Sequence, residues 1–251
     1  CHGVAEHIAR YDGFARALNE QSIVVAGHDH LGHGKSLPEG GTPVYFGDGN
    51  TWNTVVDDIY VLHQRLKQRY PDVPLCIMGH SMGSFLTRTY LIRYPGTVKA
   101  AVIMGTGWQP RAAITGGLAL ANAIAAVSGE NATSELVTEL AFGSYNKLFA
   151  PNRTKVDWLS ADESNVDDYI ADPLCGADAT VGLFRQMLHG IRFNQRQSHL
   201  RQMDREMPVL FVAGDKDPVG NCGKGVRQTY DAFRAAGMRD CTLKLYPGLR
   251  H

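Results

Sequence analysis

The chain has 251 residues, of which 44% are hydrophobic, and its 25 Lys and Arg residues balance 25 Asp and Glu residues. This is enough apolar material for one sizeable core with a small insertion, and the balanced charge gives no long-range attraction for nucleic acid or an anionic membrane. The five cysteines include no C-x-x-C pair, which argues against zinc-ribbon and redox-dithiol sites and favours reduced thiols in a cytoplasmic protein. No apolar run reaches the roughly 20 residues of a membrane-spanning helix.

Short β-branched runs alternate with longer amphipathic stretches, which is typical of parallel strands joined by crossover helices. The predicted strands are, in chain order, Ser22–Ala26, Leu75–Met78, Ala100–Met104, Val209–Ala213 and Thr242–Leu245. The helices predicted between them are Glu6–Asn19, Trp52–Arg69, Gly83–Arg93 and Val226–Ala236. We therefore expect an α/β fold with a mostly parallel, doubly wound sheet.

The alternation of strands and helices stops between residues 107 and 200, where no strand is predicted. Ala, Leu and Ile dominate Ala112–Val127, and Val181–Ile191 also has a helical pattern. We predict that residues 1–106 and 201–251 form the core and that residues 107–200 are an inserted helical cap. Some apolar residues of the cap are open to two interpretations, lining of an acyl pocket or packing between helices: Trp108, Leu118, Leu120 and Ile124.

A G-x-S-x-G motif, Gly79-His80-Ser81-Met82-Gly83, lies between a predicted strand and a predicted helix. Such a turn strains the serine backbone and lifts its Oγ out at the carboxyl end of the strand. Gly79 and Gly83 are needed because side chains there would collide with the neighbouring chain. The placement predicts Ser81 as a nucleophile. We expect His80 to be structural, because the turn points adjacent side chains away from a substrate.

A serine hydroxyl needs a base, and the base needs a carboxylate that orients it. In hydrolases with this turn the chain order is Ser, Asp, His. Asp217 and His251 each follow a predicted strand, so both are expected at the same sheet edge as Ser81. Asp217 is predicted as the acid and His251 as the base, with Asp215 as the rival acid.

The oxyanion formed during acyl transfer requires two backbone N–H donors. The Met82 N–H directly follows the nucleophile and is the first candidate. The second is expected in the loop after an earlier strand. His2-Gly3-Val4 fits this position, with the Val4 N–H as donor.

The chain resembles the monoacylglycerol lipase and lysophospholipase branch of the α/β hydrolases, which is grouped with the serine aminopeptidases. The resemblance covers essentially all 251 residues and is carried by His2–His7, His28–Ser36, Gly79–Gly83 and Gly214–Val219. Two cap segments look like bacterial lysophospholipases: Phe149–Thr154 and Asp172–Gly176.

The resemblance implies an α/β-hydrolase fold in which strands precede Cys1 and a helix follows His251, so that the sequence looks truncated at both ends. It implies cleavage of monoacylglycerols, lysophospholipids or related acyl esters through an acyl-enzyme, without a cofactor or metal. The partner is then a small-molecule acyl ester, with transient lipid contact through the cap.

Three other functions have some support in the sequence. The histidine spacing of His28–His33 is that of a binuclear zinc hydrolase, but Gly32 stands where that class has an Asp. A peptidase that removes N-terminal residues would need an acidic group for the substrate amine, with Glu130 and Glu135 as candidates. A binding module is the third alternative, but it has no use for a nucleophile, an acid and a base together.

Overall fold

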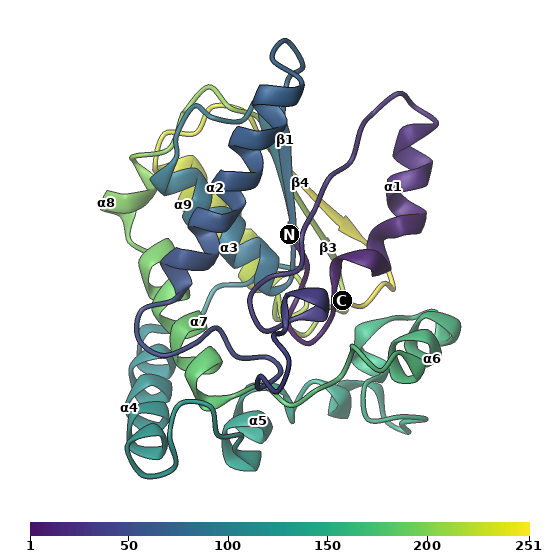
Figure 1. Cartoon of the computed structure of the whole chain (residues 1–251), viewed down its shortest axis with the longest axis vertical. Helices are drawn as coiled ribbons and strands as arrows, with labels where there is room; N and C mark the ends of the chain where they lie inside the picture. The colour runs from purple at the N-terminus through teal and green to yellow at the C-terminus, as the bar shows by residue number, and fades with distance from the viewer.

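The computed structural model describes residues 1–251 and has a parallel four-stranded sheet at its centre (Figure 1). Its strands lie in the order β1 (Cys76–His80), β2 (Ala100–Met104), β3 (Val209–Gly214) and β4 (Cys241–Tyr246). Ile103 of β2 and Phe211 of β3 are completely buried. Four of the five predicted strands are therefore confirmed to within two residues at each end, because buried parallel strands have short apolar sequences.

Helices fill most of the remaining chain. Around the sheet they are α1 (Asp12–Asn19), α2 (Trp52–Arg69), α3 (Met82–Arg93) and α9 (Lys224–Ala235). Between β2 and β3 they are α4 (Arg111–Ser128), α5 (Glu135–Phe142), α6 (Glu163–Ala171), α7 (Val181–Asn194) and α8 (Gln197–Leu200). Short 3₁₀ turns occupy Ile8–Tyr11, Gly34–Ser36, Asn146–Phe149 and Asp157–Leu159.

Helices cover the sheet on both sides. Helix α3 packs on β1 and β2, α9 packs on β3 and β4, and α2 lies against α3. Helix α1 stands on the opposite side of the sheet (Figure 1). Helix α2 buries Val55, Val56 and Ile59. The carboxyl ends of the strands point toward the helices that lie between β2 and β3.

The predicted strand Ser22–Ala26 is wrong. This segment follows α1 as an extended stretch that makes no ladder with the sheet, whose edge strand on this side is β1. Ile23, Val24 and Val25 are exposed by 50%, 66% and 39%. A β-branched run becomes a strand only where a neighbouring strand takes its backbone hydrogen bonds, and this segment lacks one.

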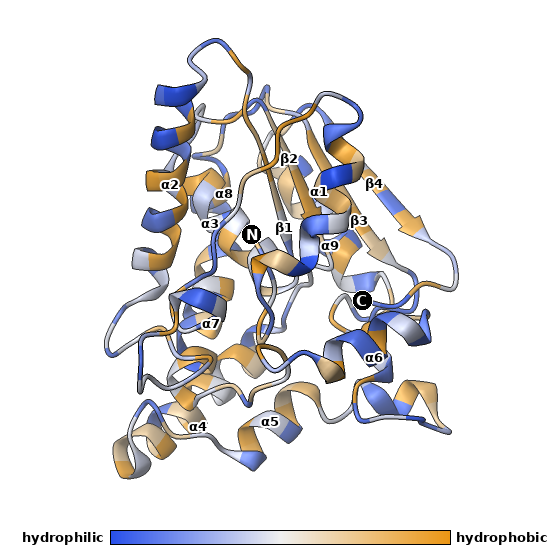
Figure 2. Cartoon of the chain, turned by 45° about the vertical axis from the view of Figure 1, so that its right-hand side comes forward, coloured by the Kyte–Doolittle hydropathy of each residue, from blue (hydrophilic) through white to orange (hydrophobic).

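The residues between β2 and β3 contain no strand, and α4, α5, α6 and α7 form a helical layer beyond the sheet edge (Figure 2). Helix α7 packs against α4 on one side and α3 on the other, which ties this layer to the core. Helix α4 buries Ile114, Leu118 and Ala121. Contrary to the sequence expectation, α4 is by length and composition apolar enough to cross a membrane, and only 17% of its apolar window is buried in the protein. All five cysteines are free thiols.

Candidate active site

Ser81 lies at a sharp turn between β1 and α3, with φ 55° and ψ −124°. This left-handed conformation is strained for a residue with a side chain. The neighbouring backbone enforces it, because a Cβ on Gly79 would lie 2.2 Å from the Gly83 carbonyl oxygen. A Cβ on Gly83 would likewise lie 2.2 Å from the Cys1 carbonyl oxygen. Both glycines are therefore required by close backbone contact.

Asp217 and His251 meet at the carboxyl ends of β3 and β4. The His251 Nδ1–H donates to Asp217 Oδ2 at 2.9 Å, and the two side chains are 2% and 0% exposed. The rival acid points elsewhere, since the Asp215 carboxylate accepts the Gly248 N–H at 2.8 Å. Of the two carboxylates, only Asp217 is thus hydrogen-bonded to the imidazole.

The Asp217 carboxylate is held in its charged form. Burial by itself would raise its pKa, but the His251 ring and the Val219 N–H, which donates to Asp217 Oδ1 at 2.9 Å, lower it below the ordinary value. A charged carboxylate keeps the proton of His251 on Nδ1. The other ring nitrogen, Nε2, is buried and has no hydrogen-bond partner. With Nδ1 bonded to Asp217, Nε2 is the nitrogen of His251 that faces away from the carboxylate and can act as the base.

The segment Gly3–Glu6 runs beside the nucleophile. A Cβ on Gly3 would lie 3.1 Å from the Ser81 Cβ and 2.6 Å from Glu6 Oε1, so glycine is required here. The Gly3 N–H donates to Glu6 Oε1 at 2.5 Å, whereas the Val4 N–H has no acceptor in the protein. Met82 is the first residue of α3, where a helix leaves its N–H groups free. Both predicted donors are therefore available beside Ser81.

Glu6 is the centre of a buried polar cluster that the sequence did not reveal. Tyr11 donates its hydroxyl proton to Glu6 Oε1 at 2.9 Å, and Arg10 Nη1 donates to Glu6 Oε2 at 2.9 Å. Burial would raise the pKa of Glu6, but His80, Arg10 and the Gly3 N–H hold it well below its usual range. The cluster keeps a negative charge next to the Gly3 loop.

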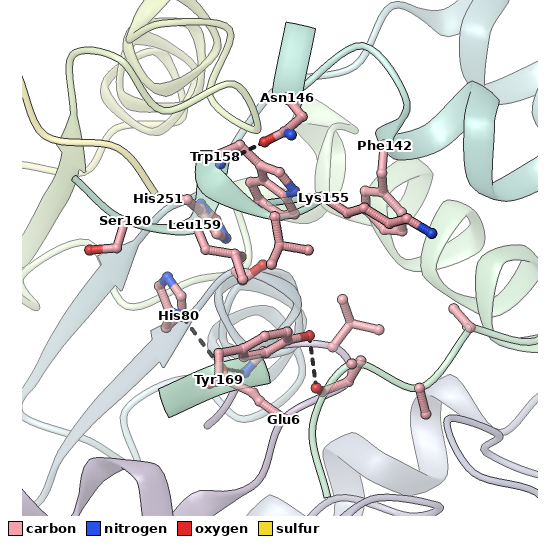
Figure 3. A pocket seen from close by; sticks show the side chains of 18 of the residues that line it. Glu6, His80, Phe142, Asn146, Lys155, Trp158, Leu159, Ser160, Tyr169 and His251 are labelled. Carbon is pink, nitrogen blue, oxygen red and sulfur yellow. Dashed lines mark hydrogen bonds and ion pairs between the residues drawn. The ribbon is translucent and has the colours of Figure 1, made fainter. Parts of the chain in front are cut away.

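His80 is part of the same cluster, which corrects the expectation that it points away from a substrate. Its Nδ1 lies 3.1 Å from the Tyr11 hydroxyl and 3.5 Å from Glu6 Oε1. Its ring centroid is 4.6 Å from that of His251, and the side chain lines the cavity of Figure 3. Burial lowers the pKa of His80, and the hydrogen bond with Glu6 only partly offsets this. At neutral pH, His80 is thus an uncharged wall of the site.

Two cavities of different character meet at Ser81. The first, of about 720 Å³, has a mixed lining that includes the polar side chains of Glu6, Arg10 and Tyr169, and we call it the polar cavity. Figure 3 shows Glu6 and Tyr169 in it. The second, of about 430 Å³, is almost wholly apolar and lies between α4, α5 and α7. Four residues line both cavities: Val4, Ser81, Phe142 and Trp158. A molecule that reacts with Ser81 can therefore place a polar part on one side and an apolar part on the other.

The 3₁₀ turn Asp157–Leu159 connects the helical layer to His251. The Trp158 ring centroid is 5.3 Å from that of His251, and the Trp158 carbonyl accepts the His251 N–H at 3.4 Å. Arg250 Nη1 donates to the carbonyl oxygens of Asp157, at 2.5 Å, and Ser160, at 3.1 Å. Trp158 therefore forms a wall of both cavities and also contacts the imidazole.

Only one of the apolar candidates of the sequence analysis lines the apolar cavity. Leu120 does, whereas Leu118 is 6% exposed and serves helix packing. Trp108 and Ile124 are partly buried against the core and are not lining residues. The distinction could not be read from the sequence, because all four residues lie on or near one apolar helix.

The acidic candidates for an amine site do not reach either cavity. Glu130 forms an ion pair with Arg185 at 2.5 Å, and Glu135 lies in the first turn of α5. Neither residue lines the cavities at Ser81. The structure therefore places neither candidate where it could bind the amine of a substrate at Ser81.

The histidines of His28–His33 have the spacing of metal ligands in the sequence but do not form a metal-binding cluster in the structure. The ligand atoms of these three histidines do not lie within 4.8 Å of one another, whereas those of His7, Asp172 and Cys175 do. In the latter group, His7 Nε2 and Asp172 Oδ2 are 2.7 Å apart. This contact joins the loop after α6 to the segment that follows the Gly3 loop.

Comparisons with known proteins agree with this geometry. The family model described as "Serine aminopeptidase, S33" matches residues 1–251. A monoacylglycerol lipase of Mycolicibacterium smegmatis is 32% identical over 100% of this chain and 79% of its own length. A monoglyceride lipase of Mus musculus is 29% identical over 100% of this chain and 73% of its own length.

Solved structures give the same result. A thermostable carboxyl esterase from Bacillus coagulans, in complex with glycerol, superimposes with a TM-score of 0.91 at 27% identity, covering 100% of this chain and 80% of its own. A lipase in an open form has a TM-score of 0.87 at 26% identity and covers 100% of this chain and 81% of its own. The similarity therefore includes the helical layer as well as the sheet.

Proposed function

The chain belongs to the serine aminopeptidase S33 family, and from this premise we propose that it is a monoacylglycerol lipase. It has the α/β-hydrolase fold and is a carboxylic ester hydrolase. The choice of monoacylglycerols among its possible substrates rests on one observation, the pair of cavities that meet at Ser81.

The two cavities match the two halves of a monoacylglycerol. A fatty acyl chain gains roughly 0.8 kcal/mol for each CH₂ that leaves water, so it favours the apolar cavity between α4, α5 and α7. The glycerol carries free hydroxyls, and the polar cavity supplies Glu6, Arg10 and Tyr169 as hydrogen-bonding groups. The ester carbonyl then lies at Ser81, between the two cavities.

The proposed reaction is a two-step acyl transfer. His251 Nε2 removes the proton of the Ser81 hydroxyl as Oγ attacks the ester carbonyl carbon, and His251 then protonates the departing glycerol oxygen. In the second step His251 deprotonates water, which attacks the acyl carbon, and the imidazolium returns this proton to Ser81 Oγ as the fatty acid is released. Asp217 stabilises the imidazolium that forms in each step.

The carbonyl oxygen becomes an oxyanion in both steps, and we assign its stabilisation to the N–H groups of Val4 and Met82. The dipole of α3 adds to this, because the amino end of the helix begins at Met82. Glu6 fixes the loop by accepting the Gly3 N–H at 2.5 Å. These donors are oriented before the substrate arrives, so stabilisation needs no rearrangement.

The substrate of such an enzyme collects in membranes or droplets, and the outer surface of the helical layer suits contact with lipid. Helix α4 has no charged residue after Arg111, and Val127 near its end is 88% exposed. Leu136 and Leu148 of the same layer are 55% and 59% exposed. A group of exposed apolar residues is typical of an interaction surface. We assign it to transient contact with a lipid surface.

The proposal is tested by comparing kcat/KM for 1-oleoylglycerol, oleoyl lysophosphatidylcholine, p-nitrophenyl octanoate and an alanine anilide. We expect the monoacylglycerol to be the best natural substrate and the anilide to be inert. A higher kcat/KM for the lysophospholipid would assign the polar cavity to a different head group. Cleavage of the anilide would favour the peptidase.

A further inference from the structure

A third cavity, which we call the cationic hollow, lies away from the two cavities at Ser81. It has a volume of about 450 Å³ and is bounded by the chain at the start of α2, Gly49–Asn53, and by one side of α7 and its end. Its basic lining residues are Arg185, His189, Arg192 and Arg196, and no Asp or Glu lines it. In a chain with a net charge of zero, this is a local concentration of positive charge.

The basic residues converge because of their spacing. Arg185, His189 and Arg192 follow one another at steps of four and three residues, which places them on one side of α7, and Arg196 follows just after the helix ends at Asn194. Gly190 and Gln186 are buried on the neighbouring side, where Trp52 packs against the helix. Trp52 thereby holds α2 beside α7 and gives the hollow its second wall.

Most of this positive charge is not neutralised by the protein. Arg185 pairs with Glu130, but Arg192 and Arg196 have no carboxylate partner. Arg192 instead donates to His189 Nδ1 at 3.1 Å. Burial lowers the pKa of His189, and Arg192 and Arg185 lower it further, as expected in a positive local field. The hollow therefore attracts an anion.

The chemistry of the side chains favours a phosphate group. Planar guanidinium groups match the oxygens of phosphate and donate two hydrogen bonds to it at once. Two unpaired arginines at the edge of a hollow can approach one anion from two sides.

The position of the hollow indicates where the phosphate comes from. Helix α7 packs directly on α4, and a Cβ on Gly117 of α4 would lie 2.9 Å from Leu188 of α7. Leu188 and His189 are adjacent in sequence but point to different sides of the helix, so α7 has α4 on one side and the hollow on another. A basic group next to an exposed apolar surface is typical of proteins that contact anionic membranes.

We propose that the hollow formed by Arg192, Arg196 and the start of α2 binds the phosphate of an anionic phospholipid while α4 contacts the apolar part of the same surface. With this site the enzyme would prefer anionic to neutral lipid surfaces. The inference rests on the proposed function as a lipase that contacts lipid. It would orient the enzyme with the helical layer toward the lipid.

The test uses Ser81→Ala protein, which binds without hydrolysis, and vesicles of phosphatidylcholine alone or in equimolar mixture with phosphatidylglycerol. The variant is Arg192→Ala with Arg196→Ala. The matched control is Arg65→Ala with Arg69→Ala, which also removes two exposed arginines four residues apart, but from α2 and outside the hollow. Thermal unfolding verifies that both variants fold.

We expect the α7 variant to bind the mixed vesicles about 25-fold more weakly, since each arginine near an anionic surface strengthens binding about fivefold. The control should change by no more than about twofold. Both should bind the neutral vesicles as the parent does. Equal binding of the two variants to mixed vesicles would overturn the assignment of the hollow to an anionic phospholipid.

Two further outcomes test the two other parts of the proposal, the apolar contact of α4 and the lipid origin of the phosphate. If the parent does not bind neutral vesicles but does bind mixed ones through Arg192 and Arg196, the apolar contact of α4 is wrong and the phosphate site stands. If glycerol 3-phosphate binds to the parent in calorimetric titration and not to the α7 variant, while both bind mixed vesicles equally, the ligand is a soluble phosphate ester. That result would overturn the lipid source.

Discussion

The sheet edge at Ser81 and the helical layer above it constrain their residues in different ways. At the sheet edge, Gly79 and Gly83 each face a backbone oxygen 2.2 Å from where a Cβ would lie, so only glycine fits. In the helical layer, a residue such as Leu120 needs only to be apolar and of suitable size. The sheet edge therefore specifies the chemistry residue by residue, whereas the helical layer specifies the substrate through the volume that it encloses.

The largest effect is expected at the nucleophile. Ser81→Ala should lower kcat by about 10⁶-fold and abolish labelling by a fluorophosphonate, because only the activated hydroxyl attacks phosphorus. The control is Ser198→Ala, an exposed serine of α8, which should label normally. Normal labelling of the Ser81→Ala protein would show that the sheet edge does not carry the reaction.

The second effect separates the two carboxylates after β3. Asp217→Asn should lower kcat by about 10³ to 10⁴-fold, because an amide favours the wrong tautomer of His251. Asp215→Asn should change kcat by less than about threefold, since Asp215 contacts the Gly248 N–H and not the imidazole. The two values of kcat are measured on p-nitrophenyl octanoate. A larger loss in Asp215→Asn would assign the acid to Asp215.

The same contrast explains what could be predicted from the sequence. The strands and the Gly79–Gly83 turn have local patterns, so their positions follow from neighbouring residues. The proximity of Asp217 and His251 also follows, because each comes after a strand of one parallel sheet. The prediction of a strand at Ser22–Ala26 was wrong because a strand depends on a neighbouring strand as much as on its own residues.

The cavity walls could not be predicted. Trp158 lies on a 3₁₀ turn with no characteristic motif, and only the folding of the helical layer brings it to His251. Glu6 lies within a segment that the resemblance included, yet its role depends on contacts with Tyr11 and Arg10. Arrangements between distant segments thus decide substrate choice, and no short sequence pattern records them.

The third prediction concerns the apolar cavity. From p-nitrophenyl butyrate to octanoate, kcat/KM should rise about a hundredfold, since each of four buried CH₂ groups contributes roughly 0.8 kcal/mol in the transition state. Leu120→Trp should remove most of this gain by filling the cavity and leave the acetate ester unchanged. Val127→Trp, on the same helix but 88% exposed, is the control. A fall in kcat/KM from acetate onward would mean a small acyl site and a short-chain esterase.

The fourth prediction concerns the polar cavity. Arg10→Ala should lower kcat/KM for 1-octanoylglycerol about tenfold, because a charged hydrogen bond to the glycerol is lost. The p-nitrophenyl ester with the same acyl chain lacks glycerol and should be nearly unaffected. Arg16→Ala, an exposed arginine of α1, is the control. Equal losses for both substrates would mean that Arg10 acts through Glu6 on the Gly3 loop and does not bind the head group.

The smallest effect is expected where the helical layer is anchored next to His251. Asp157 Oδ2 accepts the N–H groups of Arg153 at 2.6 Å and Thr154 at 3.1 Å, and Arg250 binds the Asp157 carbonyl. Burial would raise the pKa of Asp157, but the hydrogen bonds of Thr154 and Arg153 lower it below the ordinary value of 3.8.

The folded state therefore binds fewer protons than the unfolded state near pH 3.8, and the stabilisation by Asp157 is complete above that pH and lost as the pH falls through the lowered pKa. Asp157→Asn should lower the Tm by about 2–4 °C at pH 7 and by progressively less below pH 3.8. Asp178→Asn, which removes an exposed carboxylate without such bonds, should leave the Tm unchanged at both pH values. Calorimetry of the three proteins across this range measures the difference. A Tm difference for Asp157→Asn that does not shrink at acid pH would mean that shape, and not charge, is what anchors the turn beside His251.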